Sequence, residues 1–337
     1  MKTEILSTHT PELFKKAVRQ AAEQLRAGEV VALPTETVYG LCANALDEGA
    51  VAKIYQVKGR PSHNPIIVHV ASYELAQNSV SNWPQMATLM ARAFWPGPLT
   101  LVLPRSEKIP LIVTADGPTV GVRWPSHPFM QAVIRECGFP LAAPSANLSN
   151  QISPTSAEHV HQQLAGKIPL IVDGGQSQVG IESTVLDLTS PLPRILRPGM
   201  IHAESLAAVC GRLQTSATPG KPTGATLRSP GLLEKHYSPK AKLVVWKWQN
   251  EADLRSQLAS FNYPTTAIQF ITHTHIPLGM GTANVSVIPH DAEAFARAIY
   301  GELHRCDAAG VQLIIVEAPP VGAEWAGIVD RLRRAAA

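Results

Sequence analysis

Residues 29–41 read EVVALPTETVYGL, and this stretch decides the fold class of the chain. The first five residues form a short apolar run of the kind that becomes a buried strand. Pro34 ends the run, and Thr35, Glu36 and Thr37 then place hydroxyl groups and a carboxylate directly after it. Open α/β sheets bind ligands outside the carboxyl ends of their strands, so this polar turn is a candidate ligand site. A hydroxyl-rich turn that only caps a helix is the alternative interpretation.

Helical and strand patterns alternate on both sides of this stretch. Residues 11–27 have helical periodicity and end at Gly28, a natural helix terminator. Further helices are predicted over residues 47–59, 84–95, 127–138, 156–166 and 203–213. Strands are predicted over residues 64–72, 98–104, 119–125, 140–147, 169–175, 183–189 and 194–199. Interleaved helices and strands predict a mixed α/β domain.

A change of composition separates a second region from the first. Residues 215–240 are rich in Pro, Gly, Ser and Thr and have almost no apolar periodicity, which is typical of a linker. Residues 241–337 return to apolar strands separated by helices, a pattern that predicts a small, mainly parallel open sheet. We therefore predict a catalytic domain over 1–214, a linker or lid over 215–240, and a C-terminal domain over 241–337.

Composition and charge exclude several classes of protein. Of the 337 residues, 45% are hydrophobic and 16% are charged, which excludes a disordered chain. The net charge of +3 is smaller than that of a dedicated nucleic-acid binder. No apolar stretch reaches the roughly 18 residues of a membrane-spanning helix, and we see no signal peptide. The four cysteines form no CxxC pair, so we expect reduced thiols, no protein-bound metal and a cytoplasmic protein.

Cations and polar side chains follow several of the predicted elements. Lys58 and Arg60 flank Gly59 after a helix, where they could bind phosphates or simply favour the helix dipole. Arg123 stands in an apolar strand and needs an anionic partner, which is either a structural carboxylate or a substrate carboxylate. Further candidates come from the small, polar run AAPSANLSN and the turns ESTV and RPG: Ser145, Ser183 and Arg197. Ser145 lacks the Gly-x-Ser-x-Gly elbow of a serine hydrolase.

The order of these motifs is more specific than any one of them. PTETVYGL, KGRPSHNPIIVH, WPGPLTLVL, GVRWPSHP, APSANLSNQISPT, DGG, ESTVLDL and LRPG follow one another along the chain. This series resembles the YrdC/Sua5 family of threonylcarbamoyl-AMP synthases, and SPGLLEKHYSPKAKL resembles the linker of the long Sua5 form. The resemblance implies a YrdC-like twisted α/β domain with a large concave basic cavity, followed by a smaller Rossmann-like domain.

The same resemblance implies an activity and a set of site residues. The reaction would convert L-threonine, bicarbonate and ATP into L-threonylcarbamoyl-AMP, diphosphate and water, with Mg²⁺ on the phosphates. The product would serve N6-threonylcarbamoyladenosine modification of tRNA at position 37. The product would pass to the tRNA threonylcarbamoyl-transfer machinery, and the enzyme could bind tRNA without requiring it. By motif position, the residues implied to bind threonine are Thr37, His69, Arg123, Ser145 and Ser183. Those implied to bind ATP are Lys58, Arg60, Asn64, Thr119, Ala143, Ser153, Arg197 and Tyr237, with Lys58 and Arg60 as the catalytic cations.

The sequence departs from the family pattern at two positions, and it is compatible with two other functions. Leu148 and Asn150 stand where many relatives have Arg and Gly. One alternative is an RNA-binding module without catalysis, which the mild charge and few aromatics disfavour. Another is a carbamoyl-transferring relative of the hydrogenase-maturation type, which carries cysteine pairs that are missing here.

Overall fold

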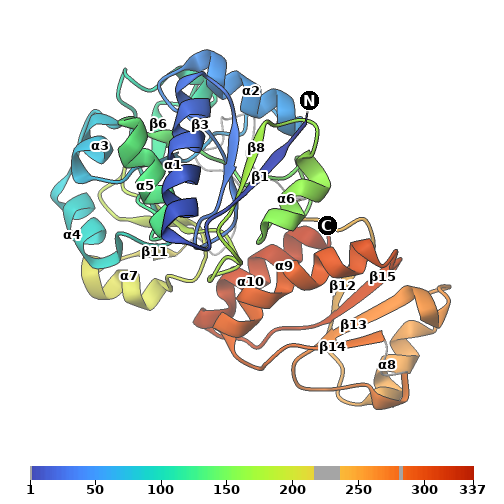
Figure 1. Cartoon of the computed structure of the whole chain (residues 1–337). Coiled ribbons are helices and arrows are strands. Elements are labelled where there is room, and N and C mark those ends of the chain that lie inside the picture. The colour runs from blue at the N-terminus through green and yellow to red at the C-terminus, as the bar shows by residue number, and fades with distance from the viewer. Residues whose placement is uncertain (1, 216–235, 281–283) are drawn as a thin grey trace. The chain divides into compact units, whose positions relative to one another are not determined.

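The computed structural model describes residues 2–215, 236–280 and 284–337. These residues form two compact α/β units, each with its own sheet (Figure 1). The first contains residues 2–149 and 153–215, and the second contains 150–152 together with the described residues from 236 onward. Most of the predicted linker over 215–240 lies outside the described residues, so its limits stay predictions.

The first unit is built on a mixed sheet. Its strands are β1 (Glu4–Ser7), β2 (Val31–Leu33), β3 (Gly40–Asn44), β4 (Val68–His69), β5 (Leu99–Pro104), β6 (Thr119–Arg123), β7 (Leu141–Ala142), β8 (Leu170–Asp173), β9 (Thr184–Asp187), β10 (Arg194–Arg197) and β11 (Gln214–Thr215). Within the described residues they lie in the order β1-β8-β2-β3-β7-β4-β6-β5-β9-β10-β11. The sheet contains parallel pairs such as β4 with β6 and antiparallel pairs such as β2 with β3. The predicted mixed α/β fold is thereby confirmed.

Helices cover both faces of this sheet. They are α1 (Pro11–Arg26), α2 (Glu48–Lys58), α3 (Tyr73–Asn78), α4 (Gln85–Phe94), α5 (Pro128–Cys137), α6 (Ala157–Leu164) and α7 (Ala203–Cys210). Strand side chains alternate between the two faces, so Val31 and Leu33 belong to one apolar core and Ala32 to the other. Helices α1 and α5 lie together on the first face (Figure 1), where the rings of Phe14 and Phe129 meet edge to face.

Local sequence signals set the ends of these helices. Thr10 accepts a hydrogen bond from the backbone N–H of Leu13 at the start of α1, and Asp47 does the same for Ala50 at the start of α2. Gly59 ends α2 in the left-handed conformation, with φ of 59°. The glycine therefore turns the chain immediately after Lys58.

The second unit contains a smaller, fully parallel sheet. Its strands are β12 (Lys242–Trp246), β13 (Ile268–Thr272), β14 (Val285–Val287) and β15 (Leu313–Glu317), and its helices are α8 (Glu251–Leu258), α9 (Ala292–Ala308) and α10 (Ala326–Ala335). The strands lie in the order β12-β15-β13-β14, and every described neighbouring pair is parallel. This confirms the predicted small, mainly parallel open sheet.

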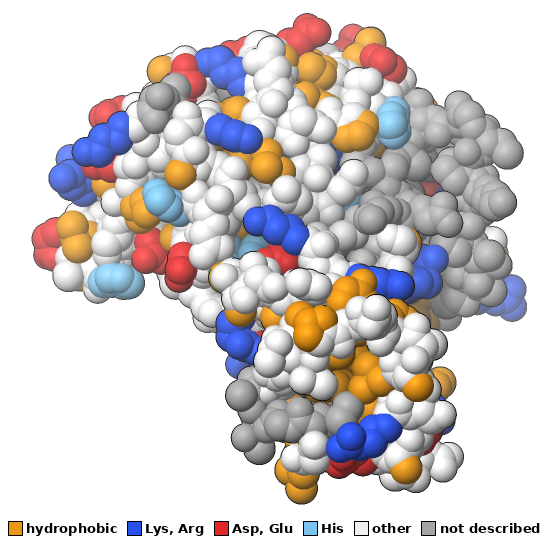
Figure 2. Space-filling model, turned by 90° about the vertical axis from the view of Figure 1, so that its right-hand side faces the viewer, with side chains coloured by type: hydrophobic (Ala, Val, Ile, Leu, Met, Phe, Trp, Pro, Cys, Tyr) orange, Lys and Arg blue, Asp and Glu red, His pale blue; other side chains and the backbone are white. Residues whose placement is uncertain are grey.

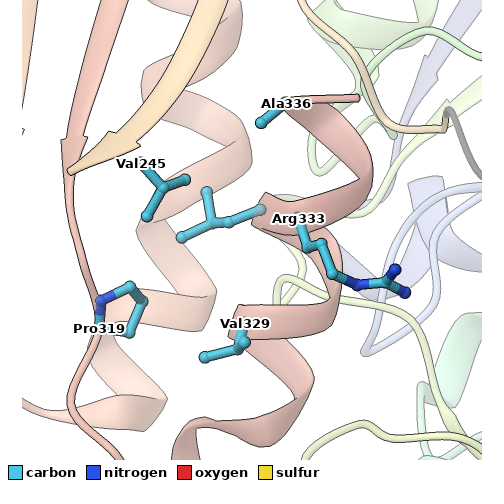
Figure 3. Close-up of a pocket in the computed structure, with 6 residues that line it drawn as sticks. Val245, Pro319, Val329, Arg333 and Ala336 are labelled. Atoms are coloured by element: carbon cyan, nitrogen blue, oxygen red, sulfur yellow. The ribbon is translucent and has the colours of Figure 1, made fainter. Parts of the chain in front are cut away.

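Two features of the second unit concern α10. A groove of about 290 Å³ lies between α10 and the ends of β12 and β15, and it is lined by Val245, Pro319, Val329, Leu332, Arg333 and Ala336. Figure 3 shows these lining side chains. The guanidinium of Arg333 points away from the aliphatic side chains of this groove. On the same helix, Asp330 pairs with Arg331 at 3.0 Å, Arg333 at 3.3 Å and Arg334 at 3.1 Å.

In the part of the chain that the structure describes, no helix is both long and apolar enough to cross a membrane.

Candidate active site

Arg123, at the end of β6, is the centre of a buried polar cluster. Its side chain is only 4% exposed. Its Nη1 donates to the hydroxyl of Thr37 at 2.9 Å, and its Nε donates to the carbonyl of Gly97 at 3.3 Å. Strand β6 places Arg123 in register beside His69 of β4. The structure thus brings together three of the residues predicted to bind threonine: Thr37, His69 and Arg123.

Glu36 supplies the anionic partner that the position of Arg123 requires. Its Oε1 lies 2.8 Å from Arg123 Nη2 and accepts a hydrogen bond from the backbone N–H of Ser126 at 3.1 Å. The ion-pair distance is short, yet Nη2 is not aligned to form a hydrogen bond with any described residue. Glu36 was missing from the site residues predicted from the sequence. Two features of the sequence could have identified Glu36. One is the position of its carboxylate in PTETVYGL, and the other is the need of Arg123 for an anionic partner.

His69 is neutral under ordinary conditions. Burial, reinforced by the nearby positive charge of Arg123, lowers the pKa of His69 to about 3. The Nδ1 atom of the buried ring has no hydrogen-bond partner among the described residues. The imidazole is therefore available to a ligand as a neutral hydrogen-bonding group.

A second group surrounds Ser183, which directly precedes β9. Its hydroxyl lies 2.8 Å from that of Thr100 on β5, and Arg197 Nη2 donates to the same hydroxyl at 3.1 Å. Arg197 also holds the carbonyl of Ser183 at 3.0 Å, and it is 3% exposed. In the same segment, the hydroxyl of Ser153 donates to Glu182 at 2.6 Å. Ser183 and Arg197 are thus neighbours, although the sequence assigned them to threonine and ATP respectively.

Lys58 holds the loop that contains Ser145. Its Nζ donates to the carbonyls of Ser145 at 2.6 Å and Asn147 at 2.5 Å, and the side chain is 3% exposed. Burial and then the charge of Arg60 lower the pKa of Lys58 from its usual value. In this structure, Lys58 therefore positions the backbone of the Ser145 loop.

Arg60 holds the turn that follows α2. Its Nε donates to the carbonyl of Asn64 at 3.0 Å, and its Nη2 donates to that of Pro65 at 2.6 Å. The side-chain Oδ1 of Asn64 is buried and has no partner among the described residues. Arg60 and Asn64 are therefore brought together, as their shared assignment to ATP requires.

The remaining predicted nucleotide residues lie in different settings. Thr119 begins β6 and is partly buried, and Ala143 follows β7, where its N–H bonds the carbonyl of Ile67. Tyr237 belongs to the second unit, where its buried ring lies 6.0 Å from that of Tyr300 and 5.5 Å from the guanidinium of Arg331. The predicted contact between Tyr237 and ATP stays a prediction.

Sheet order explains how the scattered motifs meet. Strands β7, β4, β6, β5 and β9 are consecutive neighbours. Strands β4, β6, β5 and β9 carry or directly adjoin His69, Arg123, Thr100 and Ser183, whereas β7 places Ala143 beside Ile67, before the start of β4. The site therefore consists of polar groups at neighbouring strand ends, with the loops of Glu36, Lys58 and Ser145 beside them.

Comparisons with known proteins agree with this architecture. A family model that covers Sua5, YciO and YrdC, described as "Telomere recombination", matches residues 23–199. A second, described as "Threonylcarbamoyl-AMP synthase, C-terminal domain", matches residues 201–337. A threonylcarbamoyl-AMP synthase of Pyrococcus abyssi is 39% identical over 94% of this chain and 93% of its own. One from Bacillus subtilis is 40% identical over 99% of this chain and 95% of its own.

Solved structures give the same result. The crystal structure of P. abyssi Sua5 complexed with L-threonine superposes with a TM-score of 0.90 at 37% identity, covering 100% of this chain and 98% of that one. E. coli YciO, at 24% identity and a TM-score of 0.52, shares the fold over 58% of this chain. The fold and the site therefore define an enzyme of the YrdC-like α/β class. The chain belongs to the Sua5/YciO/YrdC family of threonylcarbamoyl-AMP synthases and has the long, two-domain Sua5 form.

Proposed function

We propose that this enzyme condenses L-threonine, bicarbonate and ATP into L-threonylcarbamoyl-AMP, diphosphate and water. The observation that carries the proposal is the buried Arg123, whose Nη2 forms no hydrogen bond with a described residue while Thr37 and His69 lie beside it. A guanidinium in this setting is suited to a substrate carboxylate. The names of the similar enzymes, and the solved P. abyssi relative complexed with L-threonine, support the same substrate.

The chemistry asks the protein for positioning and charge rather than for a nucleophile. Threonine amine and bicarbonate form a carbamate with release of water, and the carbamate oxygen attacks the α-phosphate of ATP as diphosphate leaves. Two anionic reactants must be held close together, and cations must compensate charge as it develops. Arg123, Thr37, His69, Ser145 and Ser183 would hold threonine.

The nucleotide would be bound by a separate set of groups in this proposal. Lys58, Arg60 and Arg197 would face the phosphates, with Asn64, Thr119, Ala143, Ser153 and Tyr237 completing the ATP site. In the structure, Lys58, Arg60 and Arg197 already donate to backbone carbonyls. Binding of phosphates would therefore require these cations to share or exchange those acceptors.

Mg²⁺ belongs to the proposal as a partner of the ATP phosphates. Within the described residues, no three His, Cys, Asp or Glu side chains are grouped so that they could hold a metal ion. The ion would therefore be held by the ATP phosphates and by its own water molecules. When bound, the ion would neutralise phosphate charge.

The biological role extends this proposal. The product would serve the cytoplasmic enzymes that modify adenosine 37 of tRNA, and this protein would release it to them. On the face shown in Figure 2, Lys and Arg side chains are scattered among acidic ones, without one continuous basic field.

A diphosphate-release assay tests the proposed reaction. Release from ATP should require both L-threonine and bicarbonate, and it should stop when either is omitted. Release that depends on carbamoyl phosphate instead would support the carbamoyl-transfer alternative. RNA binding without any turnover would support the RNA-binding alternative.

A further inference from the structure

Glu36 has an oxygen that the protein itself does not use. The carboxylate is 4% exposed, and its Oε1 faces both Arg123 and the N–H of Ser126. Its Oε2 is buried and has no hydrogen-bond partner among the described residues. A buried carboxylate oxygen without a donor is costly, because the lost hydration is not replaced. The arrangement therefore lacks one donor.

Two other unpartnered atoms lie in the same cluster. Arg123 Nη2 has no aligned acceptor, and His69 Nδ1 has no partner among the described residues. The three side chains are linked by the 2.8 Å contact between Glu36 and Arg123 and by the strand register between Arg123 and His69. An acceptor, a donor and a neutral ring nitrogen are thus left unsatisfied side by side.

This set matches one class of ligand. An α-amino acid carries a carboxylate and an ammonium group on the same carbon, so its two opposite charges are close neighbours. A buried Glu–Arg pair offers the complementary charges at similarly close spacing. A simple carboxylate without an amine would satisfy Arg123 and offer Glu36 Oε2 no charged donor.

We infer that Glu36 recognises the ammonium group of the amino-acid substrate through Oε2, while Arg123 binds its carboxylate. The inference rests on the proposed function and adds the residue that selects an amino acid over its deaminated analogue. Glu36 thereby acts as a specificity-determining residue.

The test is the Glu36→Gln variant, which keeps the shape of the side chain and removes its charge. The probes are L-threonine as substrate and (R)-3-hydroxybutyrate as competitive inhibitor, since the latter keeps the carboxylate and hydroxyl but has no amine. We expect the threonine KM to rise at least about tenfold. The inhibition constant of (R)-3-hydroxybutyrate and the KM of ATP should stay within about twofold of wild type.

Control variants distinguish recognition of the ammonium group by Glu36 from positioning of the Arg123 guanidinium. Glu29→Gln removes a carboxylate from the partly exposed pair with Lys53 and should leave all three constants unchanged. Glu36→Asp keeps the charge and should recover part of the threonine affinity. Equal losses for threonine and (R)-3-hydroxybutyrate would overturn the inference, because they would show that Glu36 only positions Arg123. An unchanged threonine KM would overturn it too.

Failure of the inference about Glu36 can be distinguished from failure of the proposed reaction. Should the wild-type enzyme release no threonine-dependent diphosphate, the same comparison is made by calorimetric binding of threonine and (R)-3-hydroxybutyrate to both proteins. Selective loss of threonine binding in Glu36→Gln would then support the inference while the reaction is rejected. Absence of threonine binding to the wild type would reject both.

Discussion

Arg123 and Glu36 form an ion pair in which both side chains are about nine-tenths or more buried, with 2.8 Å between Nη2 and Oε1. Removing two charges from water costs several kcal/mol per ion, so such a pair is not in itself a source of stability. Additional hydrogen bonds from Ser126 to Glu36, and from Arg123 to Thr37, fix its geometry. We interpret the pair as a preorganised part of the threonine site.

Replacement of Arg123 should separate threonine binding from ATP binding. Arg123→Ala should raise the threonine KM by at least about a hundredfold, the magnitude expected for a lost charge-assisted pair, while the ATP KM stays nearly unchanged. The variant should also lose about 3–5 kcal/mol of unfolding free energy, since Glu36 is left buried without its partner. Steady-state kinetics and urea unfolding measure both effects. Equal losses for the two substrates would show that Arg123 is purely structural.

Replacement of Lys58 or Arg60 should weaken ATP binding and slow the reaction. Lys58→Ala and Arg60→Ala should each raise the ATP KM and lower kcat by roughly tenfold or more, because each removes a positive charge from the proposed phosphate site. Lys108→Ala is the matched control, since that lysine only contacts Asn78 on the surface. Kinetics with ATP varied at saturating threonine give the answer, and wild-type values in both variants would remove Lys58 and Arg60 from the site.

The depressed pKa of His69 predicts loss of stability in acid. Its folded pKa is about 3, against an unfolded value near 6.5. As the pH falls below about 6.5, His69 therefore takes up a proton in the unfolded chain but stays neutral in the folded protein. The free energy of unfolding decreases as the pH falls from about 6.5 to about 3. Between pH 7 and pH 5 this linkage amounts to about 2 kcal/mol. Urea unfolding at both pH values should show this loss in wild type and a smaller one in His69→Gln.

Gly199 should tolerate no side chain. A Cβ at this position would lie 2.5 Å from the backbone nitrogen of Thr184 and 2.8 Å from the carbonyl of Glu182. Gly199→Ala should therefore cost roughly 3 kcal/mol or more, as backbone must move. Gly59→Ala is the control, because its positive φ of 59° is strained for alanine but the space around it is open, for a cost of about 1 kcal/mol. Equal unfolding midpoints would contradict this contrast.

The arginine cluster of α10 supplies a prediction for the second unit. Burial would raise the pKa of Asp330, but Arg331 and Arg334 outweigh it and hold the pKa below its usual value. Asp330→Asn should cost about 3–5 kcal/mol, since two buried guanidinium groups lose their anion. Arg333→Ala removes a half-exposed member of the same cluster and should cost only about 0.5 kcal/mol. Chemical unfolding of the full chain compares the two.

Much of the fold could be predicted from the sequence because apolar spacing and turn residues are local features of the chain. The helix over residues 11–27, its end near Gly28, and the parallel sheet of residues 241–337 follow from apolar spacing and turn residues. Strands β1 and β3 were not predicted. β1 is only four residues long with two exposed positions, and β3 follows the polar turn so closely that the turn masks it.

The sequence identified several residues of the site but not the contacts that these residues make with one another. Motif order named Thr37, His69 and Arg123, and the buried setting of Arg123 required an anion. Which anion it meets depends on the packing of the Glu36 turn against β6, a contact between distant parts of the sequence. Similarly, the φ of 67° at Asn150 is a left-handed backbone conformation, which asparagine tolerates and which the sequence alone does not show.

The pairing of β1 with β8 has a consequence for biosynthesis. Glu4 through Ser7 find their partners only at Leu170 through Asp173. During translation, the amino-terminal segment therefore leaves the ribosome long before its neighbours exist, and its hydrogen-bonding groups stay exposed meanwhile. Non-local topology of this kind slows folding, because the ends of a long loop must meet before the strands can pair.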